Sequence, residues 1–370
     1  MNQAEREIPM KKVGREVLFL QTTEDIPRIG EGAFLRLKDG TILFACTEYF
    51  GRGYHDHDTA NIVVYHSYDE GETWKDKQIL VEKDPDALNV MSVSLLRLQN
   101  GDILLFHGRK EAVGDKVFSR KILRKSTDEG KTWTSPREII RDENWYHILN
   151  NDRVIQLKSG RILMSVARKA PREDLTPKNG EALMFFCSDD NGDTWHDSGN
   201  LLEMPFENLR GFEEPGVFQH KDGSIWCYTR TNIGCQFETV SYDDGMTWTT
   251  PKPNVFFTGA RSPMHVKNVG DRYTVAIFNP ISLYTGRNLG KLRGRAPYLL
   301  AVSETDGVGH DAEGFPRLYY LEDDMDNDYC YPAIIDGDGY FLVAYYHSNG
   351  REKPLNCTKI VKVMFSEIAK

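Results

Sequence analysis

An acidic pair and an arginine one hairpin away form the stretch of this chain with the clearest potential for chemistry. Glu213 and Glu214 precede Pro215 and an apolar run, and Arg230 ends the next run, 16 residues (230−214) after Glu214. Because a hairpin brings its two ends together, the carboxylate and the guanidinium are predicted to open onto the same face of a sheet. The pair is either part of a polar site or a structural salt bridge.

A second candidate is the segment from Tyr54 to Asp58, where imidazoles and carboxylates alternate just before a strand-like run. Neighbouring residues of an extended segment point to opposite faces, so adjacent metal ligands rarely converge, and we do not expect a metal site. A carboxylate in an exposed loop can instead act as a general acid and base. An ordinary polar loop is the alternative.

Further polar residues stand beside other strand-like runs. Arg28 precedes the first run, and the segment WYHILNNDRVIQL places four polar residues ahead of another: His147, Asn150, Asn151 and Arg153. Their amide and imidazole groups could line a sugar-binding cleft or merely cap a loop. Two arginines and two tyrosines follow near the starts of later apolar runs: Arg293, Arg295, Tyr329 and Tyr331.

Six short polar turns provide the elements that must bring these residues together. Each turn precedes an apolar run, and a turn followed by β-branched and aromatic residues is the signal of a β-hairpin. Six hairpins predict the six four-stranded blades of a propeller, whose loops at one face converge on a central channel. We expect strands at 358–365 and 16–21 to close the ring. The turns begin at Lys38, Gln99, Lys158, Lys221, Val269 and Asp336.

An internal repeat supports this architecture. The pattern S-x-D-x-G-x-T-W starts at Ser67, Ser126, Ser188 and Ser241, with a worn copy at Ser303. Spacings of 53 to 62 residues (241−188 and 188−126) suit one four-stranded sheet per repeat. Ser and Asp bond nearby backbone, Gly takes a positive φ and Trp covers the turn, so the motif indicates fold rather than chemistry. It resembles the Asp-box of sialidases and of several non-enzymatic propellers.

Composition limits the classes of function. The 370 residues are expected to form a single propeller domain spanning 1–370, with no apolar run of membrane-spanning length. The net charge of −9, without a large Lys/Arg cluster, argues against nucleic acid, although a local arginine cluster can still bind a small anion. Six cysteines without a C-x-x-C pair favour buried thiols. We expect a cytoplasmic location unless a secretory signal has been removed.

The order of the candidate residues resembles that of the exo-α-sialidases (neuraminidases) of the six-bladed Asp-box type, over the whole chain. That family has an Arg before the first strand, an Asp in the next loop, a Glu-Pro, two further Arg and a Tyr that opens the last blade. Here Arg28 is followed by Ile-Gly instead of Ile-Pro, Asp58 competes with Asp56, and Tyr331 competes with Tyr329. The matching positions are Arg28, Asp56, Glu214, Arg230, Arg295 and Tyr329.

The resemblance implies a retaining glycosidase that removes a terminal sialic acid from a glycan. The three arginines would bind the carboxylate on the anomeric carbon. Since that carboxylate would repel a carboxylate nucleophile, Tyr329 would attack while Glu214 takes its proton. Asp56 would protonate the leaving oxygen and then activate water. This chemistry needs neither a metal nor an organic cofactor.

Two other functions stay open at this point. The same pocket could serve a hydrolase or lyase that acts on uronate-containing glycans. A non-catalytic Asp-box module that binds glycan or protein is the third hypothesis. A binding module has no need of a Glu and a Tyr placed together, so the geometry of the polar residues separates the hypotheses.

Overall fold

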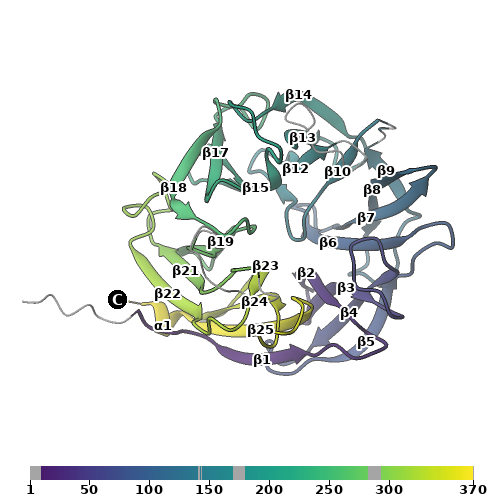
Figure 1. Cartoon of the computed structure of the whole chain (residues 1–370), viewed down its shortest axis with the longest axis horizontal. Helices are drawn as coiled ribbons and strands as arrows, with labels where there is room; N and C mark the ends of the chain where they lie inside the picture. The colour runs from purple at the N-terminus through teal and green to yellow at the C-terminus, as the bar shows by residue number, and fades with distance from the viewer. Residues whose placement is uncertain (1–9, 141, 143, 170–179, 282–292, 370) are drawn as a thin grey trace, which may run out of the picture.

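The chain forms a ring of six β-sheets around a central channel (Figure 1). The computed structural model describes residues 10–369 except 141, 143, 170–179 and 282–292. Its one helix within these residues is the short α1, Phe365–Ile368, at the end of the chain. The prediction of a six-bladed β-propeller is therefore confirmed.

The first three blades follow one another in chain order, each beginning with its innermost strand (Figure 1). Blade 1 consists of β2 Ile29–Arg36, β3 Ile42–Tyr49, β4 Ala60–Ser67 and β5 Lys75–Val81. Blade 2 consists of β6 Asn89–Arg97, β7 Ile103–Val113, β8 Lys116–Ser126 and β9 Arg137–Ile140. Blade 3 consists of β10 Tyr146–Ile148, β11 Ile155–Gln156, β12 Ile162–Lys169, β13 Ala182–Ser188 and β14 His196–Leu202.

The last three blades complete the ring. Blade 4 consists of β15 Glu213–Gln219, β16 Ile225–Arg230, β17 Cys235–Ser241 and β18 Lys252–Thr258. Blade 5 consists of β19 His265–Val269, β20 Tyr273–Phe278, β21 Tyr298–Ser303 and β22 Arg317–Glu322. Blade 6 consists of β23 Tyr329–Gly337, β24 Tyr340–His347, β25 Cys357–Met364 and, from the start of the chain, β1 Arg15–Leu20.

Closure of the ring joins the two ends of the chain. Strand β1 pairs antiparallel with β25 as the outermost strand of blade 6, so that Phe19 lies opposite Lys359. Both closing strands lie within one residue of the predicted boundaries. The start of the chain thus completes the four strands of the last blade.

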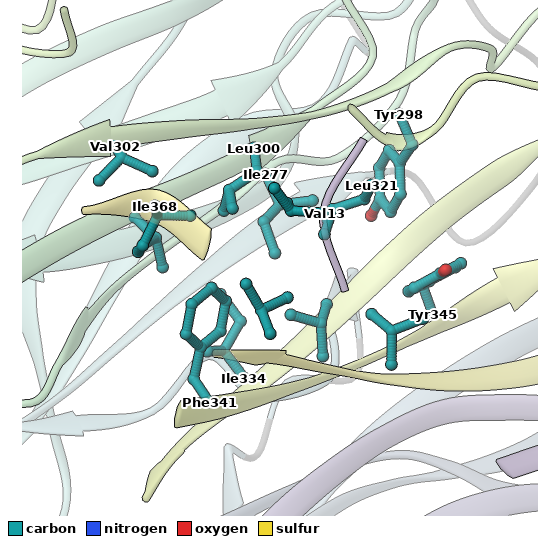
Figure 2. Packing of buried hydrophobic residues seen from close by; sticks show 14 of the residues in the cluster. Val13, Ile277, Tyr298, Leu300, Val302, Leu321, Ile334, Phe341, Tyr345 and Ile368 are labelled. Atoms are coloured by element: carbon teal, nitrogen blue, oxygen red, sulfur yellow. The ribbon is translucent and has the colours of Figure 1, made fainter. Parts of the chain in front are cut away.

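The core lies between blades rather than within them. Along β3, Ile42, Phe44 and Cys46 pack toward blade 6, whereas Leu43 and Ala45 pack toward blade 2. This alternation follows from the two-residue period of a strand and makes both faces of the sheet apolar. Figure 2 shows the cluster between blades 5 and 6, where Ile277 and Leu300 of blade 5 face Ile334 and Phe341 of blade 6.

The Asp-boxes occupy the turns between the last two strands of blades 1 to 4. In the copy between β8 and β9, the backbone N–H of Gly130 donates to Ser126 Oγ at 2.9 Å, and that of Thr132 donates to Asp128 Oδ1 at 2.9 Å. Gly130 has a φ of 77°. Trp133 is half-buried against the core between blades 1 and 2. The worn copy at Ser303 lies in the equivalent turn of blade 5.

The structure also describes the cysteines and the helix content, for which the composition made predictions. None of the six cysteines forms a disulfide, and five of them are buried, as predicted. Among the described residues, no helix is long and apolar enough to cross a membrane.

Candidate active site

A shared irregularity opens the innermost strands of four blades. In β2 the pairing shifts register between Gly30 and Ala33, and the same shift recurs at the start of β6, β15 and β23. A β-bulge bends its strand and redirects a side chain. One residue with a positive φ lies in each bulge, and all four line the same cavity: Glu31 (53°), Ser92 (59°), Glu214 (48°) and Tyr331 (58°).

Tyr331 and Glu214 meet across the channel. The Tyr331 hydroxyl donates to Glu214 Oε1 at 2.6 Å, and Arg230 Nη1 lies 2.5 Å from Glu214 Oε2 and 3.3 Å from the hydroxyl. Burial, reinforced by the Glu214 carboxylate, raises the pKa of the Tyr331 phenol well above its usual value. The phenol is therefore protonated at neutral pH and already bonded to the group that can accept its proton.

Arg28 is held directly before β2 by groups from three segments. Its Nε donates to Tyr346 Oη at 2.9 Å, and its Nη2 donates to Glu31 Oε1 at 2.7 Å. Glycine at position 30 makes this possible, because a Cβ there would lie 2.1 Å from the Tyr346 ring. The Ile-Gly that replaces Ile-Pro in this chain thus lets Tyr346 lie against β2 and reach Arg28.

Arg295 approaches the same place from blade 5. Its Nη1 lies 2.8 Å from Cys330 Sγ, and its guanidinium carbon is 5.7 Å from the centre of the Tyr331 ring. Within the described chain, Arg295 Nε is buried without a hydrogen-bond partner. The backbone N–H of Arg295 donates to Asp328 Oδ1 at 2.6 Å, which fixes the loop before β21. Part of the donor capacity of this guanidinium is therefore unused.

Asp56 extends from the exposed loop between β3 and β4. Its Oδ1 lies 2.6 Å from Arg28 Nη1, and the Arg28 charge lowers the pKa of the carboxyl far below its usual value. The main-chain carbonyl of Asp56 accepts from Lys110 Nζ at 2.6 Å and from Asn89 Nδ2 at 2.9 Å. The loop is thus tied to blade 2, while the carboxylate remains 65% exposed.

Two cavities meet at Asp56 and Tyr331. We call the first the arginine cavity; its volume is about 460 Å³, and Arg28, Arg295 and Tyr346 line it together with Asp56 and Tyr331. We call the second the lysine cavity; its volume is about 110 Å³ and Glu214 also lines it. Arg230 lines neither cavity and reaches them only through Tyr331 and Glu214. No Asp-box residue lines either one.

The structure contradicts the position expected for Tyr329. We expected Tyr329 within hydrogen-bond reach of Glu214, but its hydroxyl donates to the carbonyl of Asp324 at 3.1 Å. Its buried ring stacks 6.0 Å from the ring of Tyr298. Because the bulge lies between Cys330 and Ala333, simple alternation along β23 fails there, and Tyr331 alone of the two faces the cavities.

Three further predicted residues have structural positions instead. Asp58 accepts a bond from the backbone N–H of His55 at 2.7 Å and shapes the loop, whereas Asp56 faces the arginine cavity. His147 is buried, with its Nε2 3.7 Å from Asp142 Oδ2, although its neighbours Tyr146 and Ile148 line the lysine cavity. Asn151 donates to the carbonyl of Gly32 at 2.8 Å, so it joins blade 3 to blade 1. None of the three lines the two cavities.

Several residues of the site were missed by the sequence analysis. Glu31 and Ser92 occupy bulges, and their side chains lie 2.5 Å apart. Asn150 was not missed, since it belongs to the segment expected to line a sugar-binding cleft, and it lines the lysine cavity. Tyr346 is the remaining omission, and Gly30 was its signal, since an unexpected glycine indicates a close approach. No group of three or more His, Cys, Asp or Glu residues within the described ranges could hold a metal ion.

Comparison with known proteins places this geometry in context. Residues 31–343 match the BNR repeat-like domain. A sialidase of Paraclostridium sordellii is 25% identical over 240 residues, which are 59% of this chain and 56% of that protein. The chain therefore spans little more than half of that relative.

Solved structures share the fold. A protein of unknown function from Dyadobacter fermentans superposes with a TM-score of 0.75 at 20% identity, covering 96% of this chain and 100% of that one. The intramolecular trans-sialidase from Ruminococcus gnavus, in complex with oseltamivir carboxylate, gives 0.72 at 15% identity and covers 99% of both chains. The leech intramolecular trans-sialidase gives 0.72 at 15% identity, covering 96% and 71%. At these identities the likeness concerns fold alone.

Proposed function

The chain belongs to the family of BNR repeat-like domains, and we propose that this member is a retaining exo-glycosidase that releases a terminal acidic sugar, sialic acid before any other. The observation that carries the proposal is the bond from Tyr331 to Glu214 beside a cavity lined by Arg28 and Arg295. A phenol paired with a carboxylate suits a substrate whose own carboxylate would repel an acidic nucleophile. The sialidase from Paraclostridium sordellii supports the same class.

Binding begins with the sugar carboxylate. Arg28 and Arg295 would hold it in the arginine cavity through charge-assisted bonds. Arg230 lies behind the Tyr331 hydroxyl and adds positive charge there. Fixing this carboxylate places the anomeric carbon, to which it is attached, next to the phenol.

In the first half-reaction the Tyr331 oxygen attacks the anomeric carbon and Glu214 accepts the phenolic proton. The bond from the anomeric carbon to the leaving oxygen breaks, and Asp56 protonates that oxygen. In the second half, Asp56 takes a proton from water, whose oxygen attacks the anomeric carbon. The bond to Tyr331 then breaks, and the phenol recovers its proton from Glu214. Two displacements retain the configuration.

Asp56 needs a proton before it can act as an acid. Substrate binding would favour its protonation. In the free protein the ion pair with Arg28 keeps the carboxyl ionised. A substrate carboxylate that competes for the Arg28 donors would weaken this pair and raise the pKa of Asp56. The acid would thus be prepared only when the sugar is in place.

The test is hydrolysis of a fluorogenic aryl sialoside, with the anomer released first identified by proton NMR. We expect the retained anomer, and we expect Arg295→Met to weaken binding of an unsaturated sialic-acid analogue about 10- to 100-fold, as loss of charged hydrogen bonds requires. Arg272→Met, which removes an exposed arginine of blade 5, is the matched control. Turnover of uronate oligosaccharides instead would favour the other hydrolase or lyase, and binding without turnover would favour a glycan-binding module.

A further inference from the structure

The lysine cavity is lined by three lysines, none of which lines the arginine cavity. Lys110 of β7 and Lys121 of β8 are 5% and 2% exposed, and Lys169 at the end of β12 completes the set. The lysines are contributed by two adjacent blades. The proposed mechanism uses none of their ammonium groups.

These ammonium groups are not neutralised by the carboxylates around them. Glu31 and Asp56 form ion pairs with Arg28, and Glu214 with Arg230. No described carboxylate lies within ion-pair distance of Lys110, Lys121 or Lys169. Lys110 Nζ instead donates to the Asp56 carbonyl, and Lys121 Nζ to Ser119 Oγ at 2.6 Å. Asp56 and Glu31 attract Lys110, and Glu181 attracts Lys169, only without direct contact. The three lysines therefore have no contacting counter-ion among the described residues.

Burial without a counter-ion is costly for an ammonium group. Burial, with a smaller effect of Lys110, lowers the pKa of Lys121 well below its usual value. A bound anion would offset this cost, because it replaces the hydration that each ammonium has lost. The arrangement is therefore better explained by an anionic ligand than by packing.

A buried amide donor, Asn150 Nδ2, lies in the wall of the same cavity. Asn150 is 3% exposed and lines the cavity, and its Nδ2 has no hydrogen-bond partner among the described residues. Buried donors are normally satisfied, so each exception requires an explanation. The lysine cavity, at about 110 Å³, is several times larger than the roughly 10–15 Å³ that one water needs. An oxyanion could accept from Asn150 and from the lysines together.

The lysine cavity adjoins the arginine cavity, so its anion can belong to the same sugar. Asp56 and Tyr331 line both cavities, so a sugar whose carboxylate lies at Arg28 and Arg295 extends another substituent toward the lysines. We propose that the lysine cavity is a second anion subsite, which selects acidic sugars bearing an additional sulfate or phosphate ester. This inference rests on the proposed glycosidase function and adds a charged substituent to its substrate.

The first experiment measures anion binding without any substrate. Sodium sulfate and sodium phosphate are titrated calorimetrically into the protein at constant ionic strength in chloride. We expect Lys121→Met to weaken binding at least about tenfold, the effect of losing one charged hydrogen bond, and Lys121→Arg to retain it. Lys110 is left unchanged because it also holds the Asp56 loop. The matched control is Lys116→Met, which removes the same charge from the start of strand β8 and lines neither cavity.

The second experiment measures selectivity. Acidic glycosides with a sulfate ester, a phosphate ester or neither are compared by kcat/KM, and the better ester identifies the natural group. We expect the ester to be preferred about tenfold or more by the wild type and by Lys116→Met, and the preference to disappear in Lys121→Met.

The subsite would be overturned if Lys121→Met bound sulfate and phosphate as tightly as Lys116→Met does. An ester preference that survives Lys121→Met would overturn it as well. Failure to cleave any acidic glycoside would instead defeat the glycosidase proposal. In that case anion binding that depends on Lys121 would still support the subsite, and anion binding that does not would refute it.

Discussion

The hydroxyl of Tyr331 donates a 2.6 Å hydrogen bond to Glu214 Oε1, although the two residues are 117 positions apart in the chain. They occupy the same place in their blades: each lies in the bulge of an innermost strand and each precedes a proline, Pro332 or Pro215. A positive φ in a non-glycine residue costs on the order of 1–3 kcal/mol and persists where surrounding structure enforces it. Equivalent β-bulges in β15 and β23 thus bring the phenol of Tyr331 to the carboxylate of Glu214.

The first prediction separates the two tyrosines. Tyr331→Phe removes only the hydroxyl, so we expect the variant to fold while turnover falls by about three orders of magnitude or more, as loss of a nucleophile does. Covalent trapping by a fluorinated sialosyl donor, detected by mass spectrometry of the intact protein, should disappear with it.

Tyr329→Phe is the matched control. It loses the bond to the Asp324 carbonyl, which should cost about 1 kcal/mol of stability and leave turnover within severalfold of the wild type. Trapping that survives in Tyr331→Phe but is lost in Tyr329→Phe would return the role to Tyr329.

The fold could be predicted from the sequence because its signals are local. Each Asp-box bonds within its own eight residues, as in Ser126 to Asp128 and Gly130. Each hairpin likewise depends on adjacent residues. The six hairpin turns then indicate the number of blades, and the spacing of the repeat indicates one four-stranded sheet per blade, without knowledge of contacts between blades.

The site was less predictable because bulges shift it by one or two residues. The segment around Tyr329 and Tyr331 reads as an ordinary strand, where both tyrosines share a face. Tyr331 and Pro332 together lie opposite a single residue of β24, and this one extra residue breaks the register. An alignment of the blades with one another would have found the difference, since Tyr331-Pro332 corresponds to Glu214-Pro215. The lysine cavity left no local signal, because its lysines lie on three separate strands.

The second prediction concerns the acid. Asp56→Asn should lower hydrolysis of glycosides with alkyl leaving groups about 10²- to 10⁴-fold, the usual contribution of a general acid. Glycosides with a nitrophenyl leaving group should lose much less in the first half-reaction, since that group departs without a proton. Burst kinetics separate this step from the second. Asp58→Asn keeps the oxygen that accepts from His55 and should change neither rate appreciably; equal losses in the two variants would contradict the assignment.

The third prediction concerns stability and pH through an Asp-box. Although partial burial acts in the opposite direction, hydrogen bonds from Thr194 and Ser188 lower the pKa of Asp190 to about 2, from a usual 3.8. A depressed pKa means that this stabilisation is present above the unfolded value and is lost as the pH falls toward 2. Asp190→Ala should therefore cost about 1–3 kcal/mol near neutral pH.

Urea unfolding near neutral pH and at successively lower pH checks this. The difference between wild type and variant should shrink as the pH falls below the usual aspartate range. The control is Asp189→Ala, which removes an exposed ion pair with Arg161 and should cost at most about 1 kcal/mol. A difference that is constant with pH would show that the ionised carboxylate is not what stabilises the turn.

The fourth prediction concerns Gly30 and the orientation of Arg28. A Cβ at position 30 would lie 2.1 Å from the Tyr346 ring, so Gly30→Ala must displace that ring from Arg28. We expect a loss of about 1–3 kcal/mol of stability from overpacking. We also expect about tenfold weaker binding of the unsaturated sialic-acid analogue, measured by calorimetry, because Arg28 loses a hydrogen-bond partner.

Two comparisons show whether the binding loss comes from Tyr346 rather than from general damage. Gly259→Ala places a Cβ no closer than 3.4 Å to its neighbours and should leave stability and affinity unchanged. Tyr346→Phe keeps the ring but removes the oxygen that accepts from Arg28 Nε. Tyr346→Phe should therefore weaken binding of the analogue with little loss of protein stability. If Gly30→Ala destabilises the protein while both it and Tyr346→Phe bind the analogue normally, Tyr346 packs against β2 without orienting Arg28.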